Sequence, residues 1–168
     1  MLEKKYCTFC GKSVHKKLIE GRTRLFCTYC SSINYENPIP ATAAIVLNDK
    51  NEILLVKRKI PPKKGQWCLP GGFAELEEDP KTAAQRELKE ETNLDAQADR
   101  LIDVVRSKSE LYNSVFVIGY SMKNISGLLT AGDDSEKAVY FPLNSRPKLA
   151  FVSHETILAK FLQLKMNE

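Results

Sequence analysis

Three glutamates, Glu87, Glu90 and Glu91, stand at positions i, i+3 and i+4 of one polar stretch. An α-helix turns by about 100° per residue, so this spacing gathers their side chains along one edge of a helix. Three carboxylates so close together repel one another, and a bound cation would offset that repulsion. Because all the ligand atoms would be oxygens, the pattern predicts a hard ion, Mg²⁺ or Mn²⁺, rather than zinc.

A glycine pair and an arginine lie at positions that would complete such a site. Gly71-Gly72 precedes the glutamates, and a glycine turn lets a main-chain carbonyl approach the same ion. Arg86 can hold Glu87 in place by a charge-assisted hydrogen bond, or it can pair with Glu78. A hard cation with open positions neutralises a diphosphate and activates water, which is the chemistry of phosphoryl transfer. The alternative, an acidic helix that only faces solvent, is disfavoured by this combination of offsets.

Four of the five cysteines form two C-x-x-C pairs: Cys7, Cys10, Cys27 and Cys30. In a reducing compartment such pairs indicate zinc rather than disulfides. Two tight turns of this kind complete a tetrahedral S4 site, and four thiolates leave no open position, so the predicted zinc is structural. The fifth cysteine, Cys68, lies in the apolar sequence WCLP and is expected to be a small buried side chain rather than a nucleophile.

The helix that would carry the glutamates is marked at both ends. Asp79 can cap residues 79–92, Pro80 suits the first helical position, and Asn93 can adopt the left-handed conformation that ends a helix. A second helix is predicted near the C-terminus, with Ser153 as its cap.

Strands are predicted around these two helices. Five segments have strand-like patterns: residues 41–48, 52–58, 101–107, 114–122 and 137–143. The first two flank the turn at residues 49–51 and are expected to pair as a hairpin. Strands and helices in this order predict an α/β domain in which a mixed sheet has a helix on each side.

Composition and charge limit the partners. The chain has 168 residues, with 43% hydrophobic and 27% charged, which is ordinary for a globular protein. No apolar run approaches the roughly 20 residues that span a bilayer, and the N-terminus lacks a secretory signal, so a cytoplasmic protein without a membrane partner is expected. The net charge of +4 lies within residues 1–36, which hold seven lysines and arginines against three glutamates. We expect residues 1–36 to form a zinc ribbon and residues 37–168 a second domain.

The glutamate-bearing stretch resembles the Nudix box, G-x5-E-x7-R-E-U-x-E-E-x-G-U, in which U is aliphatic. The positions that match are Gly72, Glu78, Arg86, Glu87, Leu88, Glu90, Glu91 and Leu94. Asn93 replaces the last glycine, but asparagine also tolerates the left-handed conformation. The cysteine ribbon, YENP and the tail LAFVSHETILAKFL extend the resemblance over nearly the whole chain, to ribbon-bearing Nudix enzymes of the ADP-ribose and FAD pyrophosphatase type.

This resemblance implies a fold, a reaction and a set of roles. The fold would be a Nudix-type α/β/α sandwich with a mixed sheet, preceded by a small zinc ribbon. The reaction would be metal-dependent hydrolysis of the pyrophosphate of a nucleoside diphosphate derivative, which releases a nucleoside monophosphate. Glu87 and Glu91 would be the principal Mg²⁺ or Mn²⁺ ligands, with Glu90 and the Gly71 carbonyl as further ligands. The general base would be Glu87 or an acid of the later loop: Asp133, Asp134 or Glu136.

Substrate and partners remain the least determined part. ADP-ribose and FAD come first, NADH follows because residues 95–130 lack the SQPWPFP-like motif of NADH pyrophosphatases, and nucleoside triphosphates come last. Lys57 and Arg58 could contact substrate phosphates. The alternative is a regulator whose basic ribbon holds DNA or RNA while the second domain senses a nucleotide. The complete carboxylate set favours the enzyme, so nucleic acid is not expected as a partner, and a homodimer through the ribbon stays open.

Overall fold

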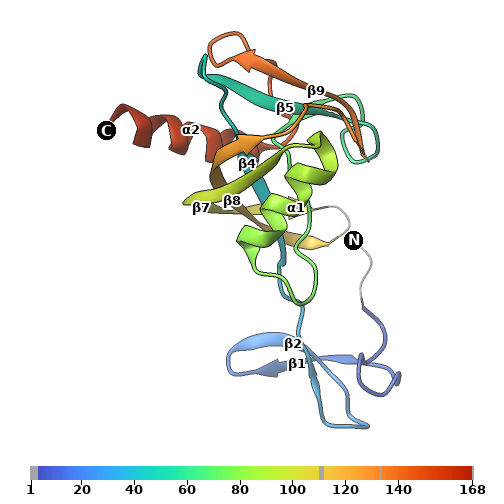
Figure 1. The fold of residues 1–168 in the computed structure, drawn as a ribbon. Coiled ribbons are helices and arrows are strands. Elements are labelled where there is room, and N and C mark those ends of the chain that lie inside the picture. Colours follow the sequence, from blue (N-terminus) through green and yellow to red (C-terminus); the bar gives the residue numbers. More distant parts are fainter. Residues whose placement is uncertain (1–3, 110–111, 133, 168) are drawn as a thin grey trace.

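The computed structural model describes residues 4–109, 112–132 and 134–167. Its N-terminal part is a small antiparallel sheet that stands apart from the larger domain (Figure 1). The strands of this sheet are β1 (His15–Ile19), β2 (Arg22–Phe26) and β3 (Ile33–Asn34). A short segment containing Pro38 leads from the ribbon directly into the first strand of the larger domain.

The larger domain contains two further three-stranded sheets. In the first, β4 (Ile39–Ile45) runs parallel to β8 (Asn113–Ser126), and β8 pairs antiparallel with β7 (Asp95–Ser109). In the second, β5 (Glu52–Arg58) lies between two antiparallel partners, β6 (Trp67–Cys68) and β9 (Ser135–Pro142). One sheet is therefore mixed and the other antiparallel, and the expected α/β fold with a mixed sheet is confirmed.

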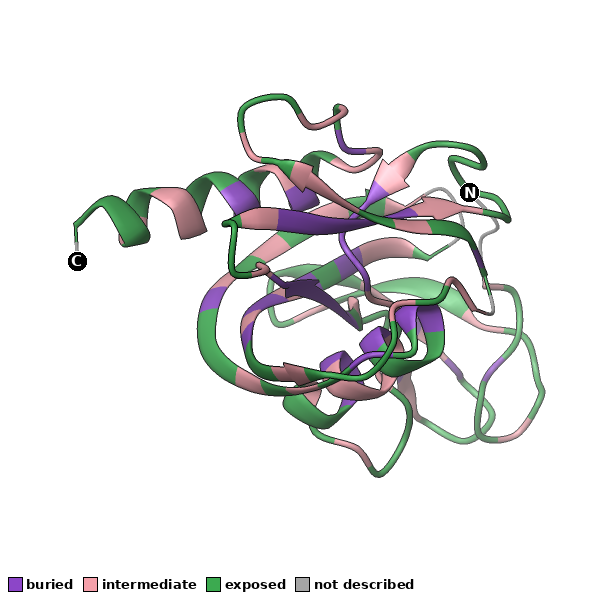
Figure 2. Cartoon of the chain, turned by 45° about the horizontal axis from the view of Figure 1, so that its top comes forward, coloured by how far each residue is buried: buried purple, intermediate pink, exposed green. Residues whose placement is uncertain are grey.

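Two helices cover opposite faces of these strands. Residues Ala43 and Ile45 of β4 pack in the core beside α2 (Val152–Met166), whereas Ala44 packs in the core beside α1 (Pro80–Thr92). This alternation follows the two-residue period of a strand. Figure 2 shows the buried residues on the strands and on parts of both helices. Neither helix, nor any other in the described residues, has the length and apolarity needed to span a membrane.

The predicted capping residues of α1 are confirmed, and the predicted capping residue of α2 is wrong. The Asp79 side chain accepts hydrogen bonds from the main-chain N–H groups of Lys81 and Thr82, and Asn93 is left-handed with φ 59°. At the other helix the cap position belongs to Phe151, which makes no side-chain capping bond. Ser153 lies inside the first turn and is buried, because the helix begins one residue before it.

The predicted pairing of the first two strands is also corrected. The turn itself is hairpin-like, since Asn48 N–H donates to Glu52 O over 3.1 Å and Leu54 N–H donates to Val46 O over 3.0 Å. Beyond the turn, however, β4 and β5 belong to different sheets. One edge of β4 is paired with β8, and the other bonds to residues 70–74, so no edge remains for β5.

Candidate active site

The glycine pair lies flat against β4. Thr42 N–H donates to Gly72 O over 2.7 Å, and Ala44 N–H donates to Pro70 O over 2.8 Å. Gly71 has φ +148°, and a Cβ atom there would lie 2.1 Å from the carbonyl oxygen of Thr42. Only glycine fits so close to a neighbouring backbone, which explains why the turn needs one at this position.

The helix α1 brings two of its glutamates to this turn. A Cβ atom on Gly72 would lie 2.6 Å from the carboxylate atoms of Glu87, so that carboxylate occupies the space a side chain would fill. Glu91 Oε2 accepts a hydrogen bond from Gly71 N–H over 2.9 Å. The predicted neighbourhood of the glycines and the glutamates is therefore present, although here Gly71 contacts Glu91 through its N–H group.

Arg86 links the remaining acidic groups of the site. Its guanidinium makes two bonds to Glu78, of 2.6 and 3.1 Å, and one bond of 2.9 Å each to Glu87 and Glu90. It also donates to Phe73 O over 3.0 Å. Such a planar fork fixes the orientation of several carboxylates at once. Both alternatives for Arg86, pairing with Glu87 and with Glu78, are realised together.

The glutamates differ in exposure. Glu91 is buried at 7% exposure, the Glu87 side chain is 16% exposed, and that of Glu90 is 41% exposed. Burial, helped by the nearby charges of Glu87 and Asp134, raises the pKa of Glu91 to about 8, although the hydrogen bond from Gly71 N–H opposes the shift. Burial also raises the pKa of Glu87, although Arg86 opposes the shift. Two carboxylates are thus held in surroundings that disfavour their negative charge.

This environment fits a hard divalent cation. A cation would restore the ionised form of Glu87 and Glu91, and the available oxygens are the ligands that Mg²⁺ prefers. The Thr42 hydroxyl, on the strand bonded to Gly72, is buried with no hydrogen-bond partner in the described structure. The carboxylates of the site do not yet lie close enough together to surround an ion. Within the described ranges, only the cysteine cluster has its ligand atoms within 4.8 Å of one another.

The later loop reaches the same helix from its C-terminal end. Gly132 N–H donates to Glu91 O over 3.1 Å, and the charge of Asp134 acts on Glu91. Glu136 is instead paired with Lys57 at 3.0 Å, and that hydrogen bond lowers the pKa of Glu136. Asp133, the third candidate base, lies outside the described residues.

The two cations proposed for substrate phosphates lie at the end of β5. Lys57 is engaged by Glu136, and Arg58 Nε donates to Pro62 O over 2.6 Å. The Arg58 guanidinium also lies 5.3 Å from the centre of the Phe151 ring. The positive charge of Arg58 nevertheless lowers the pKa of Glu91, so Arg58 lies near enough to influence that carboxylate.

An aromatic pair beside the glycine turn was not predicted as a unit. The rings of Phe73 and Tyr112 pack edge to face with centres 5.1 Å apart, and both are partly exposed, at 39% and 43%. Phe73 adjoins Gly72 and its carbonyl binds Arg86, but a main-chain acceptor leaves no signal in a sequence.

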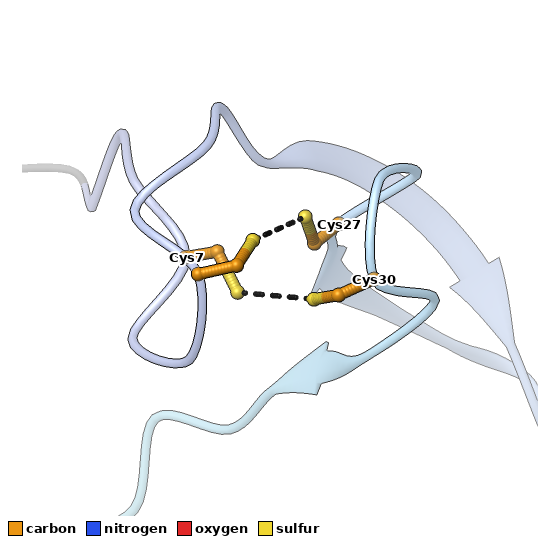
Figure 3. A group of neighbouring side chains, drawn as sticks. Cys7, Cys27 and Cys30 are labelled. Atoms are coloured by element: carbon orange, nitrogen blue, oxygen red, sulfur yellow. Dashed lines mark hydrogen bonds between the residues drawn. The ribbon is translucent and has the colours of Figure 1, made fainter.

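The cysteines form a second, separate candidate site. Cys7 Sγ lies 3.7 Å from Cys30 Sγ, and Cys10 Sγ lies 3.5 Å from Cys27 Sγ. A tetrahedral zinc site with Zn–S bonds of about 2.3 Å has sulfur atoms about 3.8 Å apart, so the spacing fits zinc. Figure 3 shows Cys7, Cys27 and Cys30 pointing toward a common centre from two loops.

Polar neighbours lower the pKa of two thiols of this cluster, Cys7 and Cys30. The Ser32 hydroxyl lies 3.3 Å from Cys7 Sγ and 3.0 Å from Cys30 Sγ, and Asn34 Nδ2 donates to Cys7 Sγ over 3.4 Å. Burial raises the pKa of Cys7, but these hydrogen bonds outweigh it and bring the pKa to about 5. Outer contacts of this kind orient metal ligands. Cys68, by contrast, is buried, and burial raises its pKa to about 12, as expected for an inert thiol.

Known families and structures resemble both parts of the chain. The family model described as the NUDIX domain matches residues 37–161, and one described as Nudix N-terminal matches residues 5–36. A crystal structure of a NUDIX hydrolase from Nitrosomonas europaea superposes with a TM-score of 0.79 at 27% identity, and covers 98% of this chain and 93% of that one.

Two curated relatives carry descriptions of their own activities. An ADP-ribose pyrophosphatase of Methanocaldococcus jannaschii is 39% identical in an alignment 160 residues long, which covers 92% of this chain and 88% of that protein. An ADPR responsive transcriptional repressor, NtrR of Acinetobacter baylyi, is 30% identical over 67% of this chain and 48% of its own length.

Proposed function

The chain belongs to the Nudix hydrolase family, and on that premise we propose that it hydrolyses ADP-ribose to AMP and ribose 5-phosphate. The observation that carries the proposal is the pair of carboxylates held against one glycine turn, that of Glu91 buried and that of Glu87 half-buried. The substrate is inferred from the ADP-ribose pyrophosphatase of M. jannaschii, which matches this chain over most of both lengths. FAD and NADH rank below ADP-ribose because no relative described above is named for either.

Glu87, Glu91 and Glu90 would hold Mg²⁺ or Mn²⁺, with the Gly71 carbonyl as a further ligand. When bound, such an ion neutralises the diphosphate and lowers the pKa of water. The residues of the chain supply the rest. Arg86 keeps Glu87 and Glu90 in place through its two 2.9 Å bonds. Glu78 acts through Arg86 as a positioning residue, since it binds two nitrogens of the same guanidinium.

In the proposed reaction a water oxygen forms a bond to one phosphorus while the bridging P–O bond breaks. The proton of the water passes to a carboxylate, and the bridging oxygen leaves with the other phosphate. Glu136 is a poor base, because its ion pair with Lys57 lowers its pKa. Glu87 and Asp134 are therefore the candidate bases among the described residues, and comparison of Glu87→Gln with Asp134→Asn would separate them.

The division of labour between the parts is also part of the proposal. Residues 1–36 would form a zinc ribbon that carries a structural Zn²⁺, and residues 37–168 would form the catalytic domain. The spacing of the four sulfur atoms, and the presence of Glu78, Glu87, Glu90 and Glu91 together in the second part, support this division. A pure nucleotide sensor would not need the complete carboxylate set, so an enzyme is favoured over a regulator.

A substrate panel tests the proposal directly. The protein would be supplied with Mg²⁺ or Mn²⁺ and incubated with ADP-ribose, FAD, NADH and nucleoside triphosphates, and nucleotide products would be separated by chromatography. We expect AMP and ribose 5-phosphate from ADP-ribose, at a higher kcat/KM than for the other compounds. In ¹⁸O-labelled water, one product phosphate should carry the label. Absence of metal-dependent turnover of every compound would reject the proposal.

A further inference from the structure

The ribbon sheet sorts its side chains onto two different faces. Residues that pair across neighbouring strands share a face, and successive residues of one strand alternate between faces. The pairs His15–Phe26, Lys17–Arg24 and Ile19–Arg22 therefore share one face, and Lys16–Leu25 and Leu18–Thr23 share the other. We call the first of these the basic face. Its polar and aromatic members are His15, Lys17, Arg22, Arg24, Phe26 and Tyr35.

On the basic face, cations lie over aromatic rings. Lys17 Nζ is 4.4 Å from the centre of the Phe26 ring, and the Arg24 guanidinium carbon is 4.9 Å from the centre of the Tyr35 ring. Contacts of this kind hold the rings and the charges in a common layer. The face is open: Tyr35 is 53% exposed, Lys17 and Arg22 are exposed, and Figure 1 shows the ribbon sheet away from the larger domain.

A basic cavity of about 310 Å³ also lies at β1. Its lining residues are Lys4, Lys5, Val14, His15, Lys16 and Leu25. Because Lys16 and Leu25 share the face opposite to the basic face, this cavity is not counted as part of the basic face.

We propose that the basic face of the ribbon binds single-stranded nucleic acid, with unpaired bases against Tyr35 and Phe26 and phosphates along Lys17 and Arg22. Exposed rings among cations suit single strands, because an unpaired base offers its flat face for stacking and a duplex does not. The cations match the phosphate backbone, which supplies most of the affinity of such complexes.

Charge argues against a second copy of the chain as the occupant. The whole net charge of +4 resides in residues 1–36. In a two-fold dimer through this face, the same positively charged patch would lie on both sides of the interface, so cations such as Lys17 and Arg22 would meet further cations and be repelled. A nucleic acid presents the opposite charge to every member of the face. The inference does not depend on which nucleotide derivative the catalytic domain hydrolyses.

Binding of a labelled 12-nucleotide oligo(dT) or oligo(U) to the full-length, zinc-loaded protein would be followed by fluorescence anisotropy at several salt concentrations. We expect binding at low salt that weakens as salt rises, and weaker binding to a duplex of the same length. The double variant Lys17→Gln/Arg22→Gln should bind about tenfold more weakly and have a salt slope smaller by about 1.4, since each of two lost single-strand phosphate contacts contributes about 0.7. Its control is Lys50→Gln/Lys160→Gln, which removes two exposed lysines from the larger domain and should bind like the wild type.

The contribution of the rings is tested separately. Tyr35→Leu should weaken binding about five- to a hundredfold, the range of one lost stacking contact, and leave the salt slope unchanged. Phe9→Leu, a matched change at a ring that is 74% exposed on the first cysteine loop, should have little effect. Zinc content and ADP-ribose hydrolysis of each variant would report whether the fold is intact, independently of nucleic acid binding.

Several outcomes would overturn the inference. They are no binding at low salt, equal loss of binding in Lys17→Gln/Arg22→Gln and in Lys50→Gln/Lys160→Gln, or a duplex bound as tightly as the single strand. Binding to vesicles of anionic lipid without binding to the oligonucleotides would assign the face to a membrane surface instead. Failure of ADP-ribose hydrolysis with intact oligonucleotide binding would reject the proposed enzyme and leave this inference standing.

Discussion

The cysteine cluster and the glutamate cluster are prepared for metal ions in different ways. The sulfur atoms of the cysteines already lie within 4.8 Å of one another, at the spacing of a tetrahedral site. The carboxylates of Glu87 and Glu90 are instead bridged by Arg86, and that of Glu91 is held by the Gly71 N–H group. In the cysteine cluster, four side chains of the protein could fill every position around an ion. In the glutamate cluster, the carboxylates are instead hydrogen-bonded to Arg86 and to the Gly71 N–H group.

This difference in how the ligand atoms are held indicates a different role for each site. A closed S4 site has no position for substrate, so its ion can only hold the surrounding loops together. Mg²⁺ gives up its water reluctantly and usually keeps several water ligands, so its site must leave positions open for water and for phosphate oxygens. Partners such as Arg86 keep the carboxylates aligned without closing the site. The contrast between a permanent and an exchangeable ion can be tested in four ways.

Removal of zinc should have the largest effect of the four tests, and it should affect only the ribbon. Among the described ribbon residues only Cys7, Leu25, Cys27 and Asn34 are buried, so the ribbon has little core of its own. Structural zinc contributes apparent free energies of about 10–16 kcal/mol in small domains, and we expect the ribbon to unfold without it. Chelation followed by addition of Mg²⁺ should restore ADP-ribose hydrolysis while the ribbon signals in ¹⁵N–¹H spectra stay collapsed. Ribbon signals that remain dispersed in zinc-free protein would contradict this.

Neutralisation of one carboxylate at the glycine turn should disable the second site without unfolding it. We expect Glu87→Gln to lower kcat for ADP-ribose by about 10²–10³-fold, the range for loss of one electrostatic stabiliser of a transition state. The thermal midpoint should not fall, because burial already disfavours the charge on Glu87. Glu77→Gln, an exposed change ten residues earlier, is the control. Unchanged turnover in Glu87→Gln would remove Glu87 from the site.

The parts of the two sites that follow local rules are those that the sequence predicted. Helical spacing placed Glu87, Glu90 and Glu91 on one helix, and the C-x-x-C repeats brought the four cysteines together. Contacts that depend on tertiary packing were not predictable in the same way. The hydrogen bond from Gly71 N–H to Glu91 depends on how residues 70–74 bond to β4. Because these residues occupy one edge of β4, that strand does not pair with β5 in one sheet, as the sequence had predicted.

Arg86→Lys should show how far the open site depends on its supporting residue. A lysine keeps the charge but cannot form the two-bond contact to Glu78 while it also reaches Glu87 and Glu90. We expect turnover to fall by about 10–100-fold, as for other residues that orient metal ligands. The Mg²⁺ concentration for half-maximal activity should rise as well, and this readout separates a positioning role from a general loss of stability. Lys89→Arg, on the exposed side of the same helix, is the matched control.

The smallest expected effect is a loss of stability in acid, and we expect it in the larger domain and not in the ribbon. His154 is buried in the larger domain, where its Nδ1 accepts a hydrogen bond from Leu69 N–H over 3.2 Å, and burial lowers its pKa to about 4. The unfolded chain binds a proton near pH 6.5 and the folded domain does not, so this stability is complete above pH 6.5 and is lost as the pH falls toward 4. Between pH 7 and pH 5 the domain should lose about 2 kcal/mol of its free energy of unfolding from this group.

The only tryptophan of the chain makes this loss measurable in one region alone. Trp67 packs against Phe141 in the larger domain, so urea unfolding followed by tryptophan fluorescence reports that domain and not the ribbon. His154→Asn keeps a hydrogen-bond acceptor for Leu69 but cannot be protonated, and it should flatten the pH dependence between 7 and 5. His15→Asn changes an exposed histidine of the ribbon and should leave that dependence as it is. An acid slope in His154→Asn equal to that of the wild type would show that other groups cause it.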